Sequence, residues 1–372
     1  MCFAGVVRVW NGEVVRFGLL CVRFGLLSVG VRVRFGEEEL RSMTKLGPAV
    51  FALSSSRGFG EGVAAAAGVE LLPHEERQFE DGEFKVRPLC SVRNRHVFVI
   101  QSLYGDSDQS VCDKLCRLVF FTGALRDAGA QRVTLAMPYL CFARKDQRSK
   151  PRDPVTTRYV ASMLESAGAT DVLTMDVHNL SAFQNAFRIP AEHLESRGLL
   201  LERVSEVAQE MDIAVVSPDM GGVRRAGLFR EALSRRTRQV ISSAFVEKHR
   251  SAGVVSGDMV IGDVEGRMVI LVDDMISRGT TISRAAAACR SHGAVQIWAA
   301  AAHGVFAADA ETILEGARLN RILTTNSIPP FRLSPGFVGR QLLVMNAAPL
   351  FGEAILRMFE GRSLVELRDD GG

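Results

Sequence analysis

The chain has 372 residues, 47% of them hydrophobic, and a formal net charge of +3. This length favours two domains, and the apolar content suffices for substantial cores. The charge is too small to indicate a nucleic-acid partner, and no apolar run approaches the length that spans a membrane. The seven cysteines follow neither a disulfide framework nor a zinc-ligand spacing. We expect a cytoplasmic protein that binds neither nucleic acid nor membrane.

Residues 1–42 differ from the rest of the chain. Val15-Arg-Phe-Gly-Leu-Leu20 recurs as Val22-Arg-Phe-Gly-Leu-Leu27. These repeats are too short to build a solenoid, and their glycines and the lack of a good cleavage site do not fit a targeting peptide. We expect this segment to be poorly ordered, and we hypothesise that translation begins at Met43.

From residue 48 onward, short segments rich in branched residues alternate with amphipathic segments. This alternation is typical of an α/β fold in which helices cover both faces of parallel sheets. The predicted strands are 49–53, 97–101, 133–137, 172–175, 214–217, 240–244, 269–272 and 297–302. The predicted helices include 111–128, 157–167, 224–234, 282–292 and 349–360.

The most informative stretch is Val269-Ile-Leu-Val-Asp-Asp-Met-Ile-Ser-Arg-Gly-Thr-Thr281. It predicts a buried strand with two adjacent carboxylates, Asp273 and Asp274, at its C-terminal end. A short polar loop then leads into a helix from Ile282. In an open parallel sheet, ligands bind beyond the carboxyl ends of strands, and helix N-termini attract phosphate.

The polar loop suits a phosphate monoester. It offers backbone N–H groups, the hydroxyls of Thr280 and Thr281, and an unblocked approach at Gly279. The two carboxylates would repel that phosphate, so we expect them to face sugar hydroxyls, a metal ion or both. These features indicate a sugar-phosphate site, although a pair of aspartates can also serve only to cap the next helix.

This stretch resembles the phosphoribosyl diphosphate loop shared by type I phosphoribosyltransferases and ribose-phosphate diphosphokinases. Further motifs follow the order of the second family from about Phe79 to Leu367. They are Phe79-Glu-Asp-Gly-Glu83, Pro138-Tyr-Leu-Cys-Phe-Ala-Arg-Lys-Asp146, Leu173-Thr-Met-Asp-Val-His178, Val216-Ser-Pro-Asp-Met-Gly-Gly222 and Thr324-Thr-Asn-Ser-Ile-Pro329. Each motif alone is weak, but together and in register they are specific. The chain therefore resembles the ribose-phosphate diphosphokinase family.

The resemblance implies two similar domains, each like a type I phosphoribosyltransferase, with parallel-rich sheets covered by helices. Residues 43–192 would form the domain on the ATP side, and residues 193–345 the domain on the ribose 5-phosphate side. Residues 346–372 would return to the first domain as a helix. Residues 1–42 match nothing in the family.

The family transfers the diphosphoryl group of ATP to the anomeric hydroxyl of ribose 5-phosphate. The products are AMP and 5-phosphoribosyl 1-diphosphate, a precursor in nucleotide biosynthesis. Such a reaction depends on positioning and on electrostatic stabilisation by Mg²⁺ and basic side chains. The resemblance assigns metal binding to His178 and Asp219.

The resemblance also implies a catalytic set. Lys248 and Arg250 lie in a segment, 247–257, whose glycine and serine content predicts a mobile surface loop. Composition alone would make it a solvated charge run. In the family, a Lys and an Arg at this spacing lie on a flap that closes over the reacting phosphates. His178 completes the set.

The implied ATP-binding residues come from two separate motifs. They are Phe79, Asp81, Glu83, Arg144, Lys145 and His178. The ring can stack on adenine, the carboxylates can accept from its exocyclic amine, and the cations face the triphosphate. In the family, the element around Phe79 reaches into a neighbouring subunit's site, which implies a homo-oligomer built from dimers, up to a hexamer. Lys145 stands where the family usually has Gln.

The implied ribose 5-phosphate site departs from the family pattern Asp-Thr-Gly-Gly-Thr. Its residues are Asp219, Asp273, Asp274, Ser277, Arg278, Gly279, Thr280 and Thr281. An acid is lost and a cation gained beside a dianionic phosphate. Arg278 either favours that phosphate, by about 1 kcal/mol at a high effective dielectric, or points into solvent and leaves binding to backbone N–H groups.

Two other functions stay open at this point. A nucleobase phosphoribosyltransferase shares the loop at 273–281, but it usually has one domain and lacks the Phe79 and Lys248 elements. A non-catalytic subunit that regulates a true synthetase would share the fold. The presence of His178, Lys248 and Arg250 favours the enzyme over that subunit.

If translation begins at Met43, mass spectrometry of the natural protein will find an N-terminal peptide that starts there. A peptide from residues 1–42 in the natural protein would contradict the hypothesis.

Overall fold

The computed structural model describes the backbone of residues 5–10, 13–24, 27–33, 47–251 and 254–367, and the side chains of 47–247 and 259–367. The chain divides into two compact units, residues 1–47 and 48–372. In the first, β1 (Gly5–Trp10), β2 (Glu13–Phe24) and β3 (Leu27–Val33) pair antiparallel. The side chains of this segment lie outside the described residues, so its poor order and the start at Met43 stay predictions.

The second unit begins with a five-stranded sheet in the order β10-β9-β8-β7-β4, in which every neighbouring pair is parallel. Its strands are β4 (Ala49–Ala52), β7 (His96–Ile100), β8 (Arg132–Met137), β9 (Asp171–Met175) and β10 (Ala191–Leu194). One face packs against α3 (Val111–Asp127), α4 (Thr156–Ser166) and α5 (Leu180–Ala186). The other packs against α2 (Arg57–Ala66) and α11 (Ala348–Glu360).

A seven-stranded sheet follows, in the order β13-β12-β11-β14-β15-β16-β17, and only its β12–β13 pair is antiparallel. Its strands are β11 (Ile213–Ser217), β12 (Ser242–Ser251), β13 (Val254–Gly262), β14 (Met268–Ile276), β15 (Gln296–Gly304), β16 (Arg321–Thr325) and β17 (Leu342–Met345). The helices α6 (Arg197–Val207) and α7 (Val223–Thr237) cover one face. The other is covered by α8 (Thr280–Ser291), α9 (Ala310–Gly316) and α10 (Pro335–Gln341).

Both faces of these sheets are buried because their strands are nearly continuous runs of apolar residues. In β14, for example, alternate residues from Met268 to Val272 enter the cores on opposite faces. The predicted α/β class, with parallel sheets covered by helices, is confirmed. The division into two similar domains stays a prediction. No described helix is long and apolar enough to cross a membrane.

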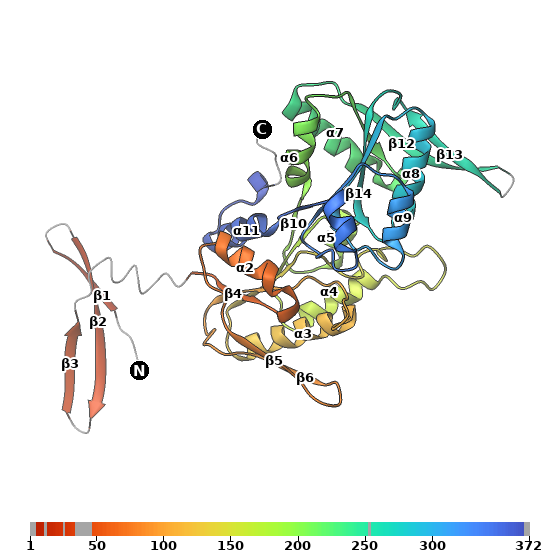
Figure 1. Ribbon diagram of the computed structural model, residues 1–372. Helices are drawn as coiled ribbons and strands as arrows, with labels where there is room; N and C mark the ends of the chain where they lie inside the picture. The colour runs from red at the N-terminus through yellow and green to blue at the C-terminus, as the bar shows by residue number, and fades with distance from the viewer. Residues whose placement is uncertain (1–4, 11–12, 25–26, 34–46, 252–253, 368–372) are drawn as a thin grey trace. The chain divides into compact units, whose positions relative to one another are not determined.

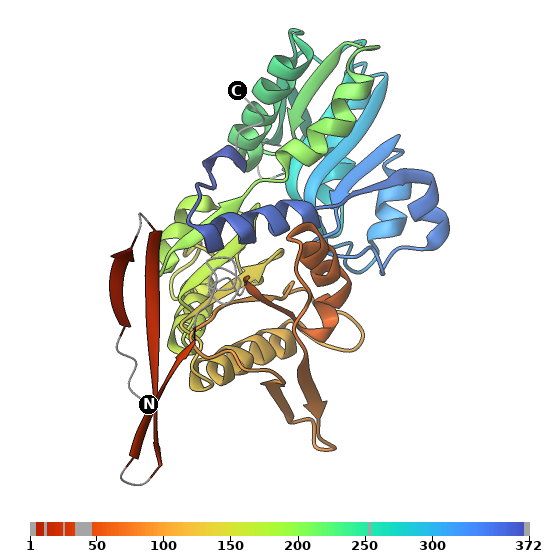
Figure 2. The ribbon, with the colours of Figure 1, turned by 90° about the vertical axis from the view of Figure 1, so that its left-hand side faces the viewer.

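The chain's last long helix returns to the first sheet. α11 lies beside α2 (Figures 1 and 2). The two helices can approach closely because Gly352 has no Cβ; a Cβ there would lie only 2.7 Å from the Cβ of Ala66. Phe351 is fully buried in this contact and meets Phe59 edge to face at 5.5 Å between ring centroids. This packing holds the last long helix against the five-stranded sheet.

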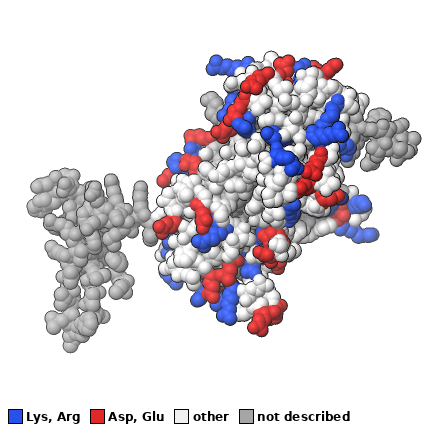
Figure 3. Space-filling view, viewed as in Figure 1, with Lys and Arg blue, Asp and Glu red and all other residues white. Residues whose placement is uncertain are grey.

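Two hairpins differ from what the sequence predicts. β5 (His74–Gln78) and β6 (Phe84–Pro88) pair antiparallel, although the sequence predicts no strand in this charged and partly exposed segment. The predicted surface loop at 247–257 instead continues β12 through Ser251 and begins β13 at Val254. Charged side chains of both signs intersperse over the face of the second unit seen in Figure 3, in keeping with the small net charge.

Candidate active site

A cavity of about 1100 Å³ lies where loops from both sheets of the second unit meet. The loops follow β8 and β9 in the first sheet and β11 and β14 in the second, so they leave the carboxyl ends of parallel strands, where such folds bind ligands. The cavity brings together most of the predicted site residues: Arg144, His178, Asp219, Asp273, Asp274, Ser277, Arg278, Gly279, Thr280 and Thr281.

Other predicted residues lie elsewhere. Phe79, Asp81 and Glu83 form the turn between β5 and β6, where the Asp81 carboxylate accepts from the backbone N–H of Glu83 at 3.0 Å, and they do not line the cavity. Lys145 is also absent from its lining, because its ammonium is paired with Asp153 in its own loop. The side chains of the predicted catalytic cations at positions 248 and 250 lie outside the described residues.

Two adjacent carboxylates form the acidic centre of the cavity. Asp273 and Asp274 have only 18% and 4% of their side chains exposed, so two like charges compete in a poorly solvated place. Arg225 compensates them, with Nη1 3.4 Å from Asp273 Oδ1 and 3.7 Å from Asp274 Oδ1. Burial and the neighbouring Asp274 raise the pKa of Asp273. Burial alone would raise the pKa of Asp274, but hydrogen bonding to His178 and the charge of Arg225 lower it.

His178 joins the two sheets. Its Nδ1 lies 2.7 Å from Asp274 Oδ2, and because that carboxylate is the acceptor, Nδ1 carries the proton. This hydrogen bond raises the pKa of His178. The loop that carries His178 turns sharply just after β9, since Asp176 has a φ of +42° and its carboxylate accepts from the backbone N–H of Ser196 at 2.7 Å. The turn therefore aims an imidazole from the first sheet at an acid of the second.

Asp219 follows β11 and caps a short turn. Its Oδ1 accepts from the backbone N–H groups of Gly221 and Gly222, at 2.9 and 3.1 Å. A Cβ on Gly222 would lie 2.7 Å from Ser217 Oγ, so the turn needs glycine there. The chain places a third carboxylate on the cavity wall in this way.

These acids do not by themselves form a complete set of ligands for a metal ion. Among the described residues, no group of three or more histidine, cysteine or acidic side chains could hold a metal ion. A hard cation that keeps several waters and binds substrate phosphates needs only one or two protein carboxylates. Asp219 and the acidic pair fit that requirement, whereas the imidazole of His178 is a less typical ligand for such a cation.

The phosphate loop ends in a strong helix start. α8 begins at Thr280, two residues before the predicted start, so the N–H groups of Thr280 and Thr281 belong to its first turn and have no intrahelical acceptor. Gly279 has a φ of +80°, and a Cβ there would lie 2.8 Å from Leu314 Cδ2. Both the positive φ and the lack of space for a Cβ therefore require glycine at position 279. The helix N-terminus lines the cavity and can bind an anion there.

Comparisons with known proteins identify the family. Residues 48–168 match the N-terminal domain of ribose phosphate pyrophosphokinase, and residues 235–368 match the phosphoribosyl synthetase-associated domain. A ribose-phosphate pyrophosphokinase of Enterococcus faecalis is 37% identical over 86% of this chain and 95% of its own length. One from Caldanaerobacter subterraneus is also 37% identical, over 86% of this chain and 96% of its own length.

A solved structure agrees. The phosphoribosylpyrophosphate synthetase from Mycobacterium smegmatis superimposes with a TM-score of 0.75 and 32% identity, covering 85% of this chain and 99% of its own. This chain belongs to the ribose-phosphate pyrophosphokinase family. The resemblance that the motifs indicated is thereby confirmed.

Arg278, which departs from the pyrophosphokinase loop pattern, forms an ion pair with an acid outside the loop. The guanidinium of Arg278 binds Asp309, just before α9, with Nε and Nη2 at 2.9 and 2.8 Å from Oδ1 and Nη2 at 2.9 Å from Oδ2. Both side chains are about half exposed, at 56% and 50%. The cation gained in the loop is thus balanced by an acid from outside it.

Sequence reasoning missed two members of this site. Asp309 is far from the loop in sequence, so no local pattern connects it to Arg278. Arg225 could have been predicted, because it lies six residues after Asp219 and in the first turn of α7. Two buried carboxylates need a nearby cation to compensate their charge. The acidic pair therefore indicated that a basic residue should lie close to it.

The Arg278–Asp309 pair predicts opposite effects of its two members. Arg278→Thr should raise KM for ribose 5-phosphate several-fold, because it leaves Asp309 unbalanced near the phosphate. Asp309→Asn should lower that KM, and the double variant should return towards the wild type. The effects should be larger at about 0.01 M salt, where the Debye length is roughly 30 Å. KM for ATP should hardly change. A KM for ribose 5-phosphate indifferent to both substitutions and to salt would show that the pair does not act on the phosphate.

Proposed function

We propose that this protein transfers the diphosphoryl group of ATP to the anomeric hydroxyl of ribose 5-phosphate, giving 5-phosphoribosyl 1-diphosphate and AMP. The observation that carries the proposal is one cavity in which a helix N-terminus, an acidic pair and the His178 loop of the other sheet meet. The names of the relatives agree with this activity. The enzyme is accordingly a diphosphotransferase of nucleotide biosynthesis.

The second sheet supplies the sugar-phosphate side. The 5-phosphate would bind the free N–H groups and hydroxyls at the start of α8, around Thr280 and Thr281. Asp273 and Asp274 would then face the ribose hydroxyls, which donate hydrogen bonds to carboxylates. Burial and the neighbouring Asp274 raise the pKa of Asp273, which makes its carboxyl better suited than that of Asp274 to accept a proton from a sugar hydroxyl.

The first sheet supplies the nucleotide side. Arg144 follows β8, lines the cavity and is exposed, so its guanidinium is available to the triphosphate. We infer Mg²⁺ as the cation, held by the Asp219 carboxylate and by substrate phosphates next to His178. A bound magnesium ion would neutralise charge that builds on the phosphate oxygens. The protein's own contribution is to hold the attacking hydroxyl and the β-phosphorus in line.

The catalytic cations Lys248 and Arg250 stay part of the proposal. Their strand, β12, passes the cavity, because Val246 and Glu247 line it. The backbone then continues into the hairpin with β13. There the backbone of residue 248 is the register partner of residue 258, and the register shifts between His249 and Arg250. A hairpin rooted at the cavity wall can bring cations over the reacting phosphates once substrates are bound.

The adenine site is proposed to be shared between subunits. Phe79 is 41% exposed at the tip of the β5–β6 hairpin and contributes nothing to the cavity of its own chain. A ring and two carboxylates, Asp81 and Glu83, at an exposed hairpin tip can complete a neighbour's site. We therefore propose a homo-oligomer built from dimers.

One assay tests the function and separates it from the alternatives. Purified protein is mixed with ATP, MgCl₂ and ribose 5-phosphate, and AMP is quantified. AMP formation that needs ribose 5-phosphate and no nucleobase supports the synthetase. Binding of both substrates without turnover would instead indicate a regulatory subunit. In a parallel assay, nucleotide formed from 5-phosphoribosyl 1-diphosphate and a nucleobase would indicate a phosphoribosyltransferase.

Removal of either cation of the β12–β13 hairpin should lower kcat more than it changes the affinity for substrates. Lys248→Ala and Arg250→Ala should each lower kcat by roughly 10²-fold or more, because each is proposed to stabilise charge that develops only in the transition state. Both KM values should change far less. Arg230→Ala is the matched control, since this arginine lies on α7 outside the cavity lining. An undiminished kcat in both hairpin variants would remove these residues from the mechanism.

A shared adenine site should make ATP affinity depend on assembly. On dilution, a dissociated monomer should keep its fold but lose ATP affinity, because it lacks the neighbour's Phe79 turn. Gel filtration and activity measured over the same dilution series test this expectation. A monomer with full activity would mean that each chain builds its own adenine site.

A further inference from the structure

A buried histidine outside the cavity lining links the two sheets. His303 lies on β15 with 2% of its surface exposed. Its Nε2 is 3.1 Å from the backbone carbonyl of Met175, and its Nδ1 is 2.8 Å from Ser327 Oγ. The carbonyl can only accept, so Nε2 carries the proton and Nδ1 accepts from the serine hydroxyl. Tyr139 packs edge to face on the ring at 5.1 Å between centroids.

Both ends of this link lead to the catalytic network. Met175 is the last residue of β9, three positions before His178, whose imidazole bonds Asp274. On its own sheet, His303 is the register partner of Met275, which directly follows Asp274 in β14. One imidazole therefore connects the strand that carries His178 with the strand that carries the acidic pair.

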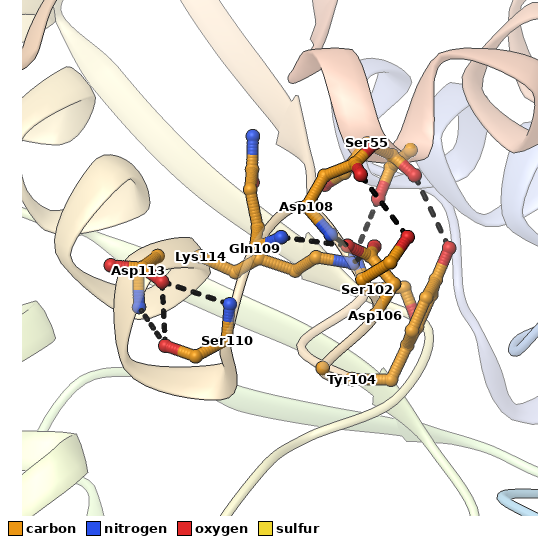
Figure 4. A network of polar contacts seen from close by, with 12 residues as sticks. Ser55, Ser102, Tyr104, Asp106, Asp108, Gln109, Ser110, Asp113 and Lys114 are labelled. Carbon is orange, nitrogen blue, oxygen red and sulfur yellow. Dashed lines mark hydrogen bonds and ion pairs between the residues drawn. The ribbon is translucent and has the colours of Figure 1, made fainter. Parts of the chain in front are cut away.

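Ser327, the other partner of His303, is also bonded to the first sheet. Its backbone carbonyl accepts from Ser102 Oγ at 2.5 Å, which adds a further hydrogen bond between the sheets. Ser102 begins a loop braced by Lys114, whose fully buried ammonium lies 2.5 Å from Asp106 Oδ2 and 3.6 Å from the centroid of the Tyr104 ring (Figure 4). Ser327 is thus fixed from the first sheet as well as by His303.

His303 is suited to stay neutral in this position. Burial lowers its pKa, and the charges of Asp176 and Asp274 oppose this effect. A neutral imidazole with one donor and one acceptor, both satisfied, makes a tie of fixed direction. Thr325 Oγ1 lies 2.7 Å from the carbonyl oxygen of Ala302 and 2.9 Å from Ser327 Oγ. It has one proton and donates to one of these two oxygens, so Ser327 Oγ keeps its own proton for the imidazole Nδ1.

We propose that His303 is a positioning residue that sets the register between the nucleotide side and the sugar-phosphate side of the cavity. It contacts no substrate, and it acts through β9 and β14 on the distance between the two bound reactants. The inference rests on the proposed function, because that function requires the two sides to meet in line. A misplacement of about 1 Å between reactants costs roughly 10²-fold in rate.

The test measures coupling between the two substrates as well as turnover. Affinity for α,β-methylene-ATP with MgCl₂ is measured by calorimetry with and without ribose 5-phosphate, alongside kcat and both KM values. The variants are His303→Leu, His303→Gln and Ser327→Ala. His96→Leu is the matched control, since His96 is also desolvated and bonds a hydroxyl, Thr134 Oγ1 at 2.7 Å, but within one sheet.

We expect His303→Leu and Ser327→Ala to lower the substrate coupling by roughly 2- to 30-fold, with a matching fall in kcat. His303→Gln should retain more of both, because its amide offers a donor and an acceptor. His96→Leu should lower thermal stability and leave the coupling unchanged. Should His303→Leu fail to fold, Ser327→Ala decides.

Two results would overturn the inference. One is wild-type coupling in folded His303→Leu and Ser327→Ala variants, and the other is an equal loss of coupling in His96→Leu, which would mark a general effect of destabilisation. Failure of the proposed function is separate, since it would be seen as absence of AMP formation by the wild-type protein.

Discussion

The hydrogen bond between His178 Nδ1 and Asp274 Oδ2 is the interaction on which the site depends. Asp274 is almost completely buried beside a second carboxylate, and a buried charge is tolerated only when it is paired and hydrogen-bonded. Its partners come from both sheets: His178 follows β9 of the first, and Arg225 lies on α7, which covers the second. Separating the sheets would remove His178 from Asp274 and leave Arg225 alone to compensate two buried carboxylates, so this hydrogen bond favours the closed arrangement of the two sheets.

This arrangement fits a reaction in which the protein does little covalent chemistry. The residues that must keep fixed distances lie at strand ends, which are backed by cores on both faces of each sheet. The residues proposed to arrive with substrate or from a neighbour lie on hairpins instead, at β12–β13 and at the Phe79 turn. Figure 1 shows both hairpins running out from the packed layers. Rigid strand ends thus position the reactants, while the hairpins can supply groups that must move.

The sequence predicted those parts that depend on local pattern. Apolar runs such as Val269–Val272 indicate buried parallel strands. Gly279 and the two threonines after it indicate that a helix begins shortly after such a strand. The hairpin β5–β6 was not predicted because β5, His74–Gln78, has no apolar residue, and the alternation in β6, Phe84–Pro88, covers only five residues. Asp309 and His303 were not predicted because their partners are distant in the chain. Only tertiary packing reveals such pairs.

The most direct test of this account is a crystal structure with ribose 5-phosphate, α,β-methylene-ATP and MgCl₂ bound together. We predict the 5-phosphate on the N–H groups at the start of α8, the ribose hydroxyls facing Asp273 and Asp274, and the anomeric oxygen in line with the β-phosphorus. A sugar phosphate bound away from α8, or a triphosphate that reaches the cavity without approaching His178, would contradict it.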